Sequence, residues 1–247
     1  MVRTAWDLGH DGTPTGVLVV TLDRPERRNA VDHATLRGLA DAQAQAADAR
    51  VLLLTGAPPA FSAGADLTGV EEGEFARTLG DVLRGFTTLP IPTVAAVDGA
   101  ALGAGTQLVI ACDLRVATPS SRFGIPAARL GLVVDHWTVE RLAREFGWSI
   151  ARAMLLGAET YDGAALHAAG GVHRLGGLVD ALDWARQLAT LAPLTIAAHK
   201  VALERSAPEP APDELVAAAR LAAWRSADAI EGRNAFLAKR PAKFEGR

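Results

Sequence analysis

The sequence predicts an α/β fold with parallel strand pairing. Short apolar runs rich in β-branched residues end at turn-forming residues, which is typical of buried strands. Helical patterns separate successive runs, and parallel strands need such long crossovers. A length of 247 residues is ample for one large buried core.

The first strands are expected at 17–22 and 51–55. The first run ends at Asp23-Arg24-Pro25 and the second at Gly56-Ala57-Pro58-Pro59. Between them, Asp32 can cap a helix that extends to about Asp48. Strand, helix and strand therefore follow one another.

The alternation continues through the middle of the chain. We expect a helix at 71–89, a strand at 93–97, a helix opening at Gly103 and a strand at 113–117. From about residue 135 the pattern is nearly continuous helix, broken at glycines 147, 157, 170 and 171, with a short strand at 172–175.

The pattern of the residues beyond 193 predicts a helical appendage. Helical segments are expected at 195–206, 213–225 and 227–239, with a proline-rich linker at 207–212. We therefore expect a core at 1–192 and a helical oligomerisation region at 193–247, which packs on the core or on another subunit.

Composition excludes several classes of protein. A formal charge of −3 argues against a dedicated nucleic-acid binder, and a single cysteine cannot form an internal disulfide. The N-terminus has Asp7, His10 and Asp11 where a signal peptide needs apolar residues, and charges interrupt the longest apolar stretch, 94–117. We expect a cytoplasmic protein without a membrane span. The histidines lack HxxxH or HxH spacing, so no metal site is expected.

Two glycine-containing loops are the first candidates for a site. FSAGADL at 61–67 has small residues around Gly64 that permit close approach of a ligand to the main chain, although a tight loop with a helix cap explains the segment equally well. The segment 98–108 enters an apolar helix, so its first amides are free donors at the positive end of the helix dipole. Glycines 99, 103 and 105 lack the GxGxxG spacing, which argues against a nicotinamide cofactor. Amides that converge from two such loops can form an oxyanion hole.

Five segments together resemble the enoyl-CoA hydratase/isomerase family, or crotonase superfamily. They are LDRPERRNAVD at 22–32, FSAGADL at 61–67, VDGAALGAGTQLVIACDLRVAT at 97–118, FGIPAARLGLVVD at 123–135 and KRPAKF at 239–244. The resemblance covers essentially the whole chain. It implies a crotonase-like spiral of ββα units with a C-terminal helical trimerisation region, assembly as a homotrimer or dimer of trimers, and an acyl-CoA ligand without a further cofactor.

The resemblance also implies roles for individual residues. The amides of Ala65 and Ala104 would hold the thioester oxygen, and the family usually has glycine where Ala104 stands. The other residues expected to bind the acyl-CoA are Arg28 and Ala30 at the CoA entrance, Ala63 against the adenine, Asp66 and Leu67 along the acyl and pantetheine path, and Gly103, Gln107 and Ala127.

The sequence departs from the family where hydratases carry two catalytic glutamates. Gln107 and Ala127 occupy those positions, and neither can act as a general acid or base. Asp135 lies eight residues after Ala127. In this respect the sequence resembles dienoyl-CoA isomerases and chlorobenzoyl-CoA dehalogenases, which have a catalytic aspartate at this position. Asp135 can also cap the amphipathic helix that follows it, and the two roles are compatible.

These residues support two functions. The first is an acyl-CoA enzyme of fatty-acid metabolism, a lyase or isomerase with Asp135 as its acid/base group. The alternative is a non-catalytic acyl-CoA binder or carrier. Near the C-terminus, Lys239, Arg240 and Lys243 form either a solvated charge run or a contact for the adenosine phosphate.

Overall fold

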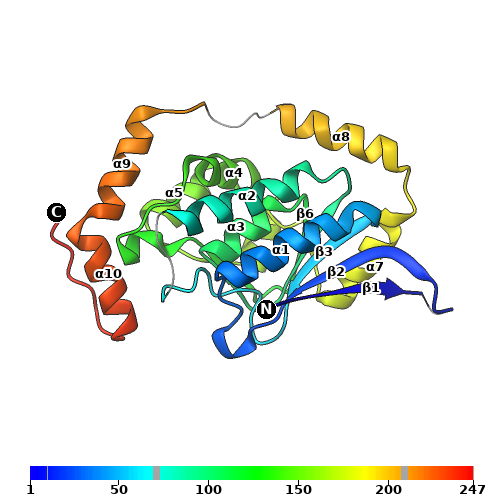
Figure 1. Cartoon of the computed structure of the whole chain (residues 1–247), viewed down its shortest axis with the longest axis horizontal. Coiled ribbons are helices and arrows are strands. Elements are labelled where there is room, and N and C mark those ends of the chain that lie inside the picture. The colour runs from blue at the N-terminus through cyan, green and yellow to red at the C-terminus, as the bar shows by residue number, and fades with distance from the viewer. Residues whose placement is uncertain (10, 69–72, 207–210, 247) are drawn as a thin grey trace. The chain divides into compact units, whose positions relative to one another are not determined.

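The computed structural model describes the chain except residues 10, 69–72, 207–210 and 247. The chain, drawn in Figure 1, divides by its internal contacts into two compact units. The first comprises Met1–Phe123 and Tyr161–Pro208, and the second Gly124–Thr160 and Glu209–Arg247.

The first unit is built on a six-stranded sheet of order β1-β2-β3-β4-β6-β9. The first pair is antiparallel and the remaining neighbours are parallel. The strands are β1 (Val2–Leu8), β2 (Pro14–Leu22), β3 (Val51–Gly56), β4 (Thr93–Val97), β6 (Leu114–Ala117) and β9 (Arg174–Leu175). A smaller sheet pairs β5 (Ala100–Leu102), β7 (Arg122–Gly124) and β8 (Tyr161–Asp162).

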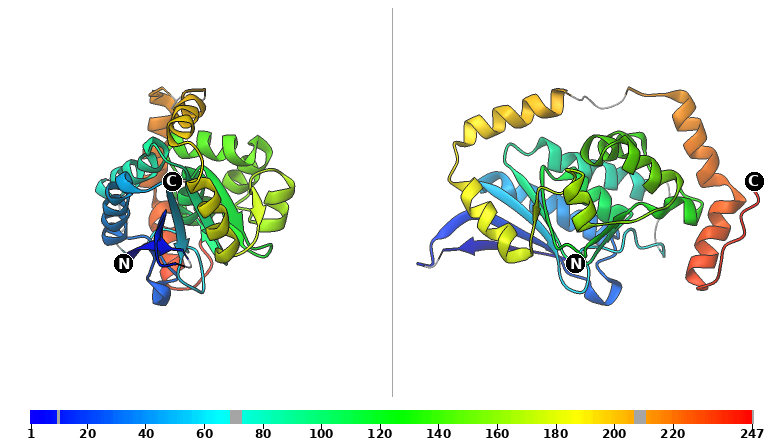
Figure 2. Two further views of the ribbon diagram at one scale, coloured as in Figure 1. Left: turned by 90° about the vertical axis from the view of Figure 1, so that its right-hand side faces the viewer. Right: turned by 180° about the vertical axis from the view of Figure 1, so that it is seen from behind.

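Helices cover both faces of the larger sheet. The helices of the first unit are α1 (His33–Gln45), α2 (Glu74–Thr88), α3 (Ala104–Ala111), α6 (Gly163–Ala168), α7 (Leu178–Ala189) and α8 (Pro193–Ser206). Figure 2 shows α1 in blue and α7 in yellow on either side of the strands. Asp32 begins α1 as predicted, because its Oδ1 accepts the Thr35 amide at 2.7 Å. The chain order β1-β2-α1, β4-β5-α3 and β6-β7-α4 repeats a ββα unit.

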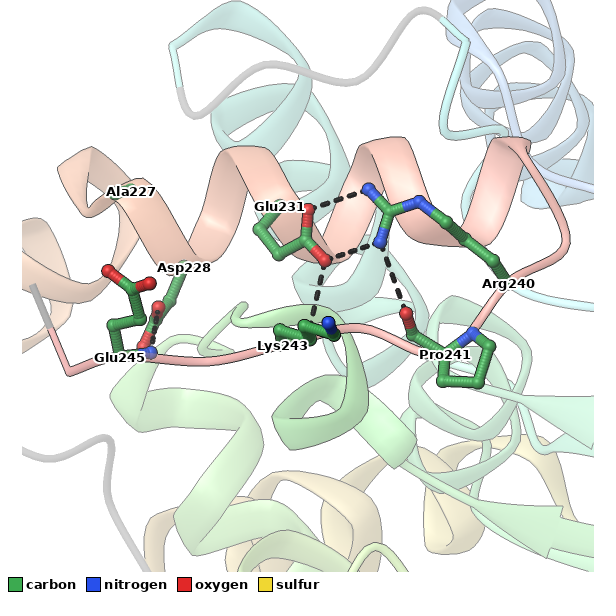
Figure 3. Close-up of a pocket in the computed structure, with 7 residues that line it drawn as sticks. All are labelled: Ala227, Asp228, Glu231, Arg240, Pro241, Lys243 and Glu245. Carbon is green, nitrogen blue, oxygen red and sulfur yellow. Dashed lines mark hydrogen bonds and ion pairs between the residues drawn. The ribbon is translucent and has the colours of Figure 1, made fainter.

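The second unit is helical. It contains the 3-10 helix η3 (Pro126–Leu130) and the helices α4 (His136–Phe146), α5 (Trp148–Leu156), α9 (Glu214–Arg225) and α10 (Ala227–Leu237). After α10 the chain turns back along the helix. The amide of Lys243 donates to Glu231, and the amides of Glu245 and Gly246 donate to Asp228. Asp228, Glu231, Lys243 and Glu245 are among the residues that line a hollow of about 660 Å³ (Figure 3).

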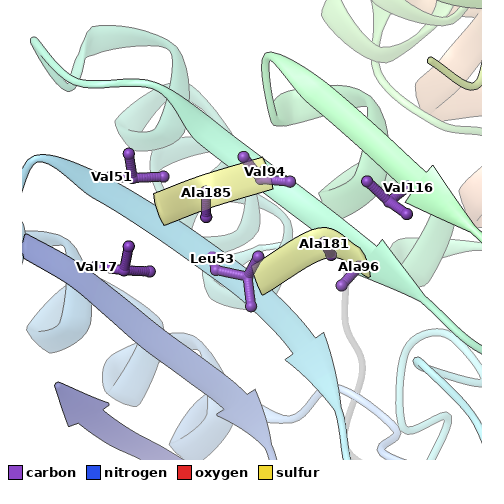
Figure 4. Packing of buried hydrophobic residues seen from close by; sticks show 8 residues of the cluster. All are labelled: Val17, Val51, Leu53, Val94, Ala96, Val116, Ala181 and Ala185. Atoms are coloured by element: carbon purple, nitrogen blue, oxygen red, sulfur yellow. The ribbon is translucent and has the colours of Figure 1, made fainter. Parts of the chain in front are cut away.

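The hydrophobic core of the first unit lies between the sheet and α7. Alternate residues of parallel strands face one side, and those at this side are Val17, Val51, Leu53, Val94, Ala96 and Val116, packed against Ala181 and Ala185 of α7 (Figure 4). The intervening residues, among them Leu18, Leu52 and Leu54, are fully buried on the other face. Both faces are therefore covered, which explains the continuous apolar runs of the central strands.

The predicted α/β class is confirmed, together with β2, β3, β4, β6, β9, the opening of α3 and three C-terminal helices. Three strands were missed, β1, β5 and β7, and the expected helical stretch after residue 135 contains β8 at Tyr161–Asp162. Residues 71–72 of the predicted helix and 207–210 of the predicted linker lie outside the described residues. The boundaries of the two units differ from the expected division at residue 193. The oligomerisation region expected at 193–247 stays a prediction. None of the described helices is long and apolar enough to cross a membrane.

Candidate functional site

The two glycine-containing loops lie against each other in the first unit. The Ser62 amide donates to Ala100 O at 2.9 Å, and Ser62 O accepts the Leu102 amide at 2.9 Å. A Cβ on Gly64 would lie 2.9 Å from Leu102 O and 3.7 Å from Ala104 N. Gly64 also has φ +108, in the region that favours glycine. The loops can thus approach this closely only because Gly64 has no side chain.

Each loop presents one main-chain amide that has no partner among the residues the structure describes. Ala104 is the first residue of α3, so its N–H has no acceptor within the helix, and the residue is 4% exposed. On the other loop, Val31 donates to Gly64 O and accepts from the Asp66 amide, each at 2.8 Å. The amide of Ala65 between them faces away from Val31. Among the described residues, no acceptor is found for either amide. The main-chain geometry therefore offers two donors on adjoining loops.

Asn29 ties the first of these loops to the segment before α1. It is 1% exposed and has φ 56. Its Nδ2 donates to Ala57 O and Ala60 O, each at 2.7 Å, and its Oδ1 accepts the Arg24 amide at 2.8 Å. Sequence reasoning gave Asn29 no role. The available clue was an asparagine in a turn-rich segment, because asparagine tolerates the left-handed conformation.

Asp66 is held as an ionised carboxylate. The Thr68 hydroxyl donates to its Oδ1 at 2.7 Å, and Arg24 lies 3.2 Å from its Oδ2. The hydrogen bonds from Thr68 and then the Arg24 guanidinium lower the pKa of Asp66 below its ordinary value. Asp66 thus holds the loop in which the half-buried Leu67 also lies.

The residues expected at the CoA entrance lie together. The Arg28 carbonyl accepts the Ala63 amide at 2.9 Å, and both residues are exposed. Ala30 is half-buried, and its carbonyl accepts Arg24 Nη1 at 2.7 Å. The segments 28–30 and 63–67 consequently form one continuous surface of loops.

Gln107 lies one turn into α3, where its main-chain N–H donates to the carbonyl of Gly103 at 3.0 Å. It is 6% exposed, and its neighbours along this helix are buried as well. The structure thus places Gly103, Ala104 and Gln107 on the same helical turn.

Ala127 and Asp135 belong to the second unit. Ala127 lies in η3 and is half-buried. Asp135 caps α4, because its Oδ1 accepts the Thr138 amide at 3.1 Å, and this confirms the capping role. Its Oδ2 accepts no hydrogen bond from the described residues. The cap therefore uses one of the two carboxylate oxygens of Asp135.

Among the basic residues near the C-terminus, Arg240 is paired within the chain. Its guanidinium lies 2.6 Å and 2.8 Å from the two carboxylate oxygens of Glu231. This bidentate contact and the bond from the Lys243 amide lower the pKa of Glu231 to about 2. Lys239 and Lys243 are exposed.

Comparisons with known proteins agree with the resemblance. Residues 12–247 match the family described as enoyl-CoA hydratase/isomerase. A probable enoyl-CoA hydratase of Mycobacterium tuberculosis is 42% identical over 238 residues, which cover 93% of this chain and 96% of that protein. The 2,3-dehydroadipyl-CoA hydratase of Escherichia coli is 36% identical over 253 residues, which cover 94% and 96%.

Solved structures share the fold. A methylmalonyl-CoA decarboxylase in complex with 2-nitronate-propionyl-CoA has a TM-score of 0.88 at 23% identity, covering 100% of this chain and 98% of that one. An enoyl-CoA hydratase from Mycobacterium avium subsp. paratuberculosis has a TM-score of 0.83 at 25% identity, covering 98% of each chain. The crotonase-like fold is thus confirmed, and the chain belongs to the enoyl-CoA hydratase/isomerase family.

Proposed function

We propose that this protein binds acyl-CoA thioesters in the cytoplasm through an oxyanion hole formed by the amides of Ala65 and Ala104. The observation that carries the proposal is the pair of unpartnered amides on adjoining loops, one of them at the start of a buried helix. A thioester enolate carries negative charge on its oxygen, and fixed amide donors stabilise that charge without a titrating side chain. No further cofactor is needed.

The remaining site residues would follow the ligand. The exposed loop surface at Arg28, Ala30 and Ala63 would receive the CoA moiety. The acyl and pantetheine parts would pass Asp66 and Leu67, with Gly103, Gln107 and Ala127 beside the reacting end. Asp66 would serve as a loop support there, because Thr68 and Arg24 already use its carboxylate oxygens.

Asp135 is the proposed acid/base group. Gln107 does not titrate and Ala127 has no proton to give, so two-carboxylate hydration lacks both of its usual groups. A reaction that needs one proton-transfer group, such as double-bond isomerisation or thioester hydrolysis, fits these residues better. The protein would then act as an enzyme of fatty-acid metabolism.

A second candidate is an acyl-CoA binder or carrier without catalysis. It is favoured by the same pair, Gln107 and Ala127, because the amide donors would remain while the acid/base groups are lost. Both candidates need the oxyanion hole and differ only in turnover.

We also propose a homotrimer or a dimer of trimers. Large apolar side chains are exposed along the described parts of the C-terminal helices, among them Leu194 (84%), Leu203 (69%) and Leu215 (80%). Burial of such a surface favours self-association. Light scattering should give about 77 kDa for a trimer of 25.8 kDa chains, or twice that mass for a dimer of trimers. A mass equal to one chain would contradict the assembly.

The hole can be tested by Ala104→Pro. Proline lacks the N–H yet is favoured at the first position of a helix, so the change removes one donor at little cost to α3. We expect titration calorimetry to show crotonyl-CoA or longer acyl-CoA binding to the wild type, weakened at least about fivefold in the variant. Turnover, where present, should fall about 10²–10³-fold.

The matched control is Glu214→Pro, which makes the same change at the first residue of α9. It should bind as the wild type does. Absence of binding to any acyl-CoA by the wild type, or unchanged binding by Ala104→Pro, would contradict the proposal.

Asp135→Asn separates enzyme from binder. Asparagine also caps helices well, so α4 should keep its start. For an enzyme, isomerisation or hydrolysis should fall about 10²–10⁴-fold while binding persists. A binder would show binding without turnover in either protein, and unchanged turnover in the variant would reject the role of Asp135.

A further inference from the structure

The segment that leads to Asp135 is in main-chain contact with α10. Gly131 follows η3 with φ 65, and its amide donates to Ala127 O. A Cβ at Gly131 would lie 2.6 Å from Asp228 O and 2.9 Å from Ala229 N. Only glycine fits here, because both the left-handed backbone and the space exclude a side chain.

A second glycine makes the same contact from the other side. A Cβ at Gly232 of α10 would overlap the carbonyl oxygen of Leu130 and lie 2.8 Å from its Cα. Backbone thus faces backbone at both positions. The separation of the two elements is fixed by main-chain atoms, which cannot move aside as the end of a side chain can.

Helix α9 contacts the same segment, 130–135, at Val133, three residues after Leu130. The indole Nε1 of Trp224 donates to Val133 O at 2.8 Å. Val133 precedes Asp135 by two residues, and Asp135 then caps α4 through Thr138. The segment is therefore held by α10 at Leu130 and Gly131, by α9 at Val133 and by α4 at Asp135.

The far side of α10 is braced as well. The carbonyl of Asp228 faces Gly131, while its carboxylate accepts the amides of Glu245 and Gly246 at 2.7 and 2.8 Å. Figure 3 shows the bond between Asp228 and Glu245. Glu231, one turn later, holds Arg240 and the amide of Lys243. The end of the chain thus stabilises the turn of α10 that contacts Gly131.

We infer that Trp224 and Gly232 form a clamp that positions Asp135. The inference rests on the proposed function, in which Asp135 transfers a proton. Such a group must be held closely, because a misplacement of about 1 Å can cost about 10²-fold in rate. The C-terminal helices therefore order the catalytic segment in addition to any part they take in assembly.

Hydrogen exchange tests the clamp without any ligand. Trp224→Phe keeps an aromatic ring and loses one N–H donor, whereas Gly232→Ala inserts a methyl group against the Leu130 carbonyl. We expect amide exchange in peptides covering 131–139, which include the Thr138 amide bound by Asp135, to speed about three- to tenfold in Trp224→Phe. The effect should be larger in Gly232→Ala.

Two controls make the same chemical changes elsewhere. Trp148→Phe alters an indole that is 52% exposed, and Gly80→Ala adds a methyl group that would meet only the movable guanidinium of Arg84. Both should leave exchange at 131–139 unchanged. Should Gly232→Ala fail to fold, Trp224→Phe still decides the question. Wild-type exchange in Trp224→Phe would overturn the clamp, whereas failure of the proposed function would appear only as absent acyl-CoA binding.

A kinetic cycle tests that the clamp acts through Asp135. Trp224→Phe should lower kcat and leave KM within about twofold, because it displaces a proton-transfer group rather than a binding group. In the Asp135→Asn background the same change should have no further effect on kcat. Equal losses in both backgrounds would overturn the positioning role.

Discussion

Asn29 supports the first loop of the candidate site with a single buried side chain. Its amide bonds three main-chain groups, the N–H of Arg24 and the carbonyls of Ala57 and Ala60. The residue also adopts φ 56, which asparagine tolerates better than alanine does. It therefore joins the segment before α1 to the segment that leads into the 61–67 loop.

Replacement of Asn29 by alanine should destabilise the protein. Loss of three hydrogen bonds at about 1 kcal/mol each, with a left-handed alanine in addition, should lower the free energy of unfolding by about 3–4 kcal/mol. Urea denaturation would measure the change. Asn234→Ala alters an exposed asparagine of α10 and should change stability by less than about 0.5 kcal/mol. Equal effects of the two changes would contradict this role for Asn29.

At the scale of single residues, the sequence indicates which loops lie at the candidate site but not which side chains hold those loops in place. The two glycine-containing loops follow from the sequence pattern, and the family resemblance singles out Ala65 and Ala104 within them. The structure brings the two loops together. The role of Asn29 depends on carbonyls 28 and 31 residues away, which no local pattern indicates. Trp224 and Val133, 91 residues apart, present the same difficulty.

Among the elements, α8 depends on one buried lysine. Lys200 is 6% exposed, and its Nζ donates to Phe86 O at 2.8 Å, Ile91 O at 3.0 Å and Asp113 Oδ2 at 2.7 Å. All three ammonium hydrogens thus have acceptors. The rest of α8 is half-buried or exposed, so this contact places the helix on the first unit.

Lys200→Met should destabilise the protein by about 3 kcal/mol, because it leaves a half-buried carboxylate and two carbonyls without their lysine donor. This value is at the lower end of the range of about 3–5 kcal/mol for breaking a buried ion pair, because Asp113 keeps its hydrogen bonds from Thr93. Chemical unfolding would measure the loss, with the exposed Lys239→Met as control. In an Asp113→Asn background, Lys200→Met should lower the free energy of unfolding by less than it does in the wild type. Equal losses in the two backgrounds would contradict the coupling of Lys200 to Asp113.

The elements that the sequence missed share a physical cause. β1 is an edge strand with five exposed residues, so it lacks the apolar run that marked β2, β3 and β4. Strands β7 and β8 have three and two residues, too few for a pattern of alternation. Their pairing is set by tertiary contacts rather than by local propensity.

The whole molecule should lose stability in acid. Arg186 lowers the pKa of Asp7, the Thr68 hydrogen bonds lower that of Asp66, and Arg240 lowers that of Glu231 to about 2. As the pH falls below the ordinary carboxyl values, the unfolded chain takes up protons before the folded one does. The stabilisation is therefore full above about pH 5 and is lost progressively toward pH 2.

Unfolding free energies measured between pH 3 and 7 should show this decline. Asp7→Asn removes one carboxylate that Arg186 holds at 2.8 Å, so the variant should be less stable at pH 7 and should lose less on acidification. Asp41→Asn, at an exposed carboxylate of α1, should keep the wild-type pH dependence. A steeper decline in Asp7→Asn than in the wild type would contradict the assignment.

The enclosure of Lys200 also determines how the folded chain can be modified covalently. The chain has three lysines, and Lys239 and Lys243 lie exposed near the C-terminus. Amine-reactive reagents require a free amine lone pair, which a buried ammonium with three acceptors does not offer. Coupling of the native protein to a reactive surface would therefore occur at the C-terminal segment or at the N-terminal amine, while α8 would remain unlabelled until the chain unfolds.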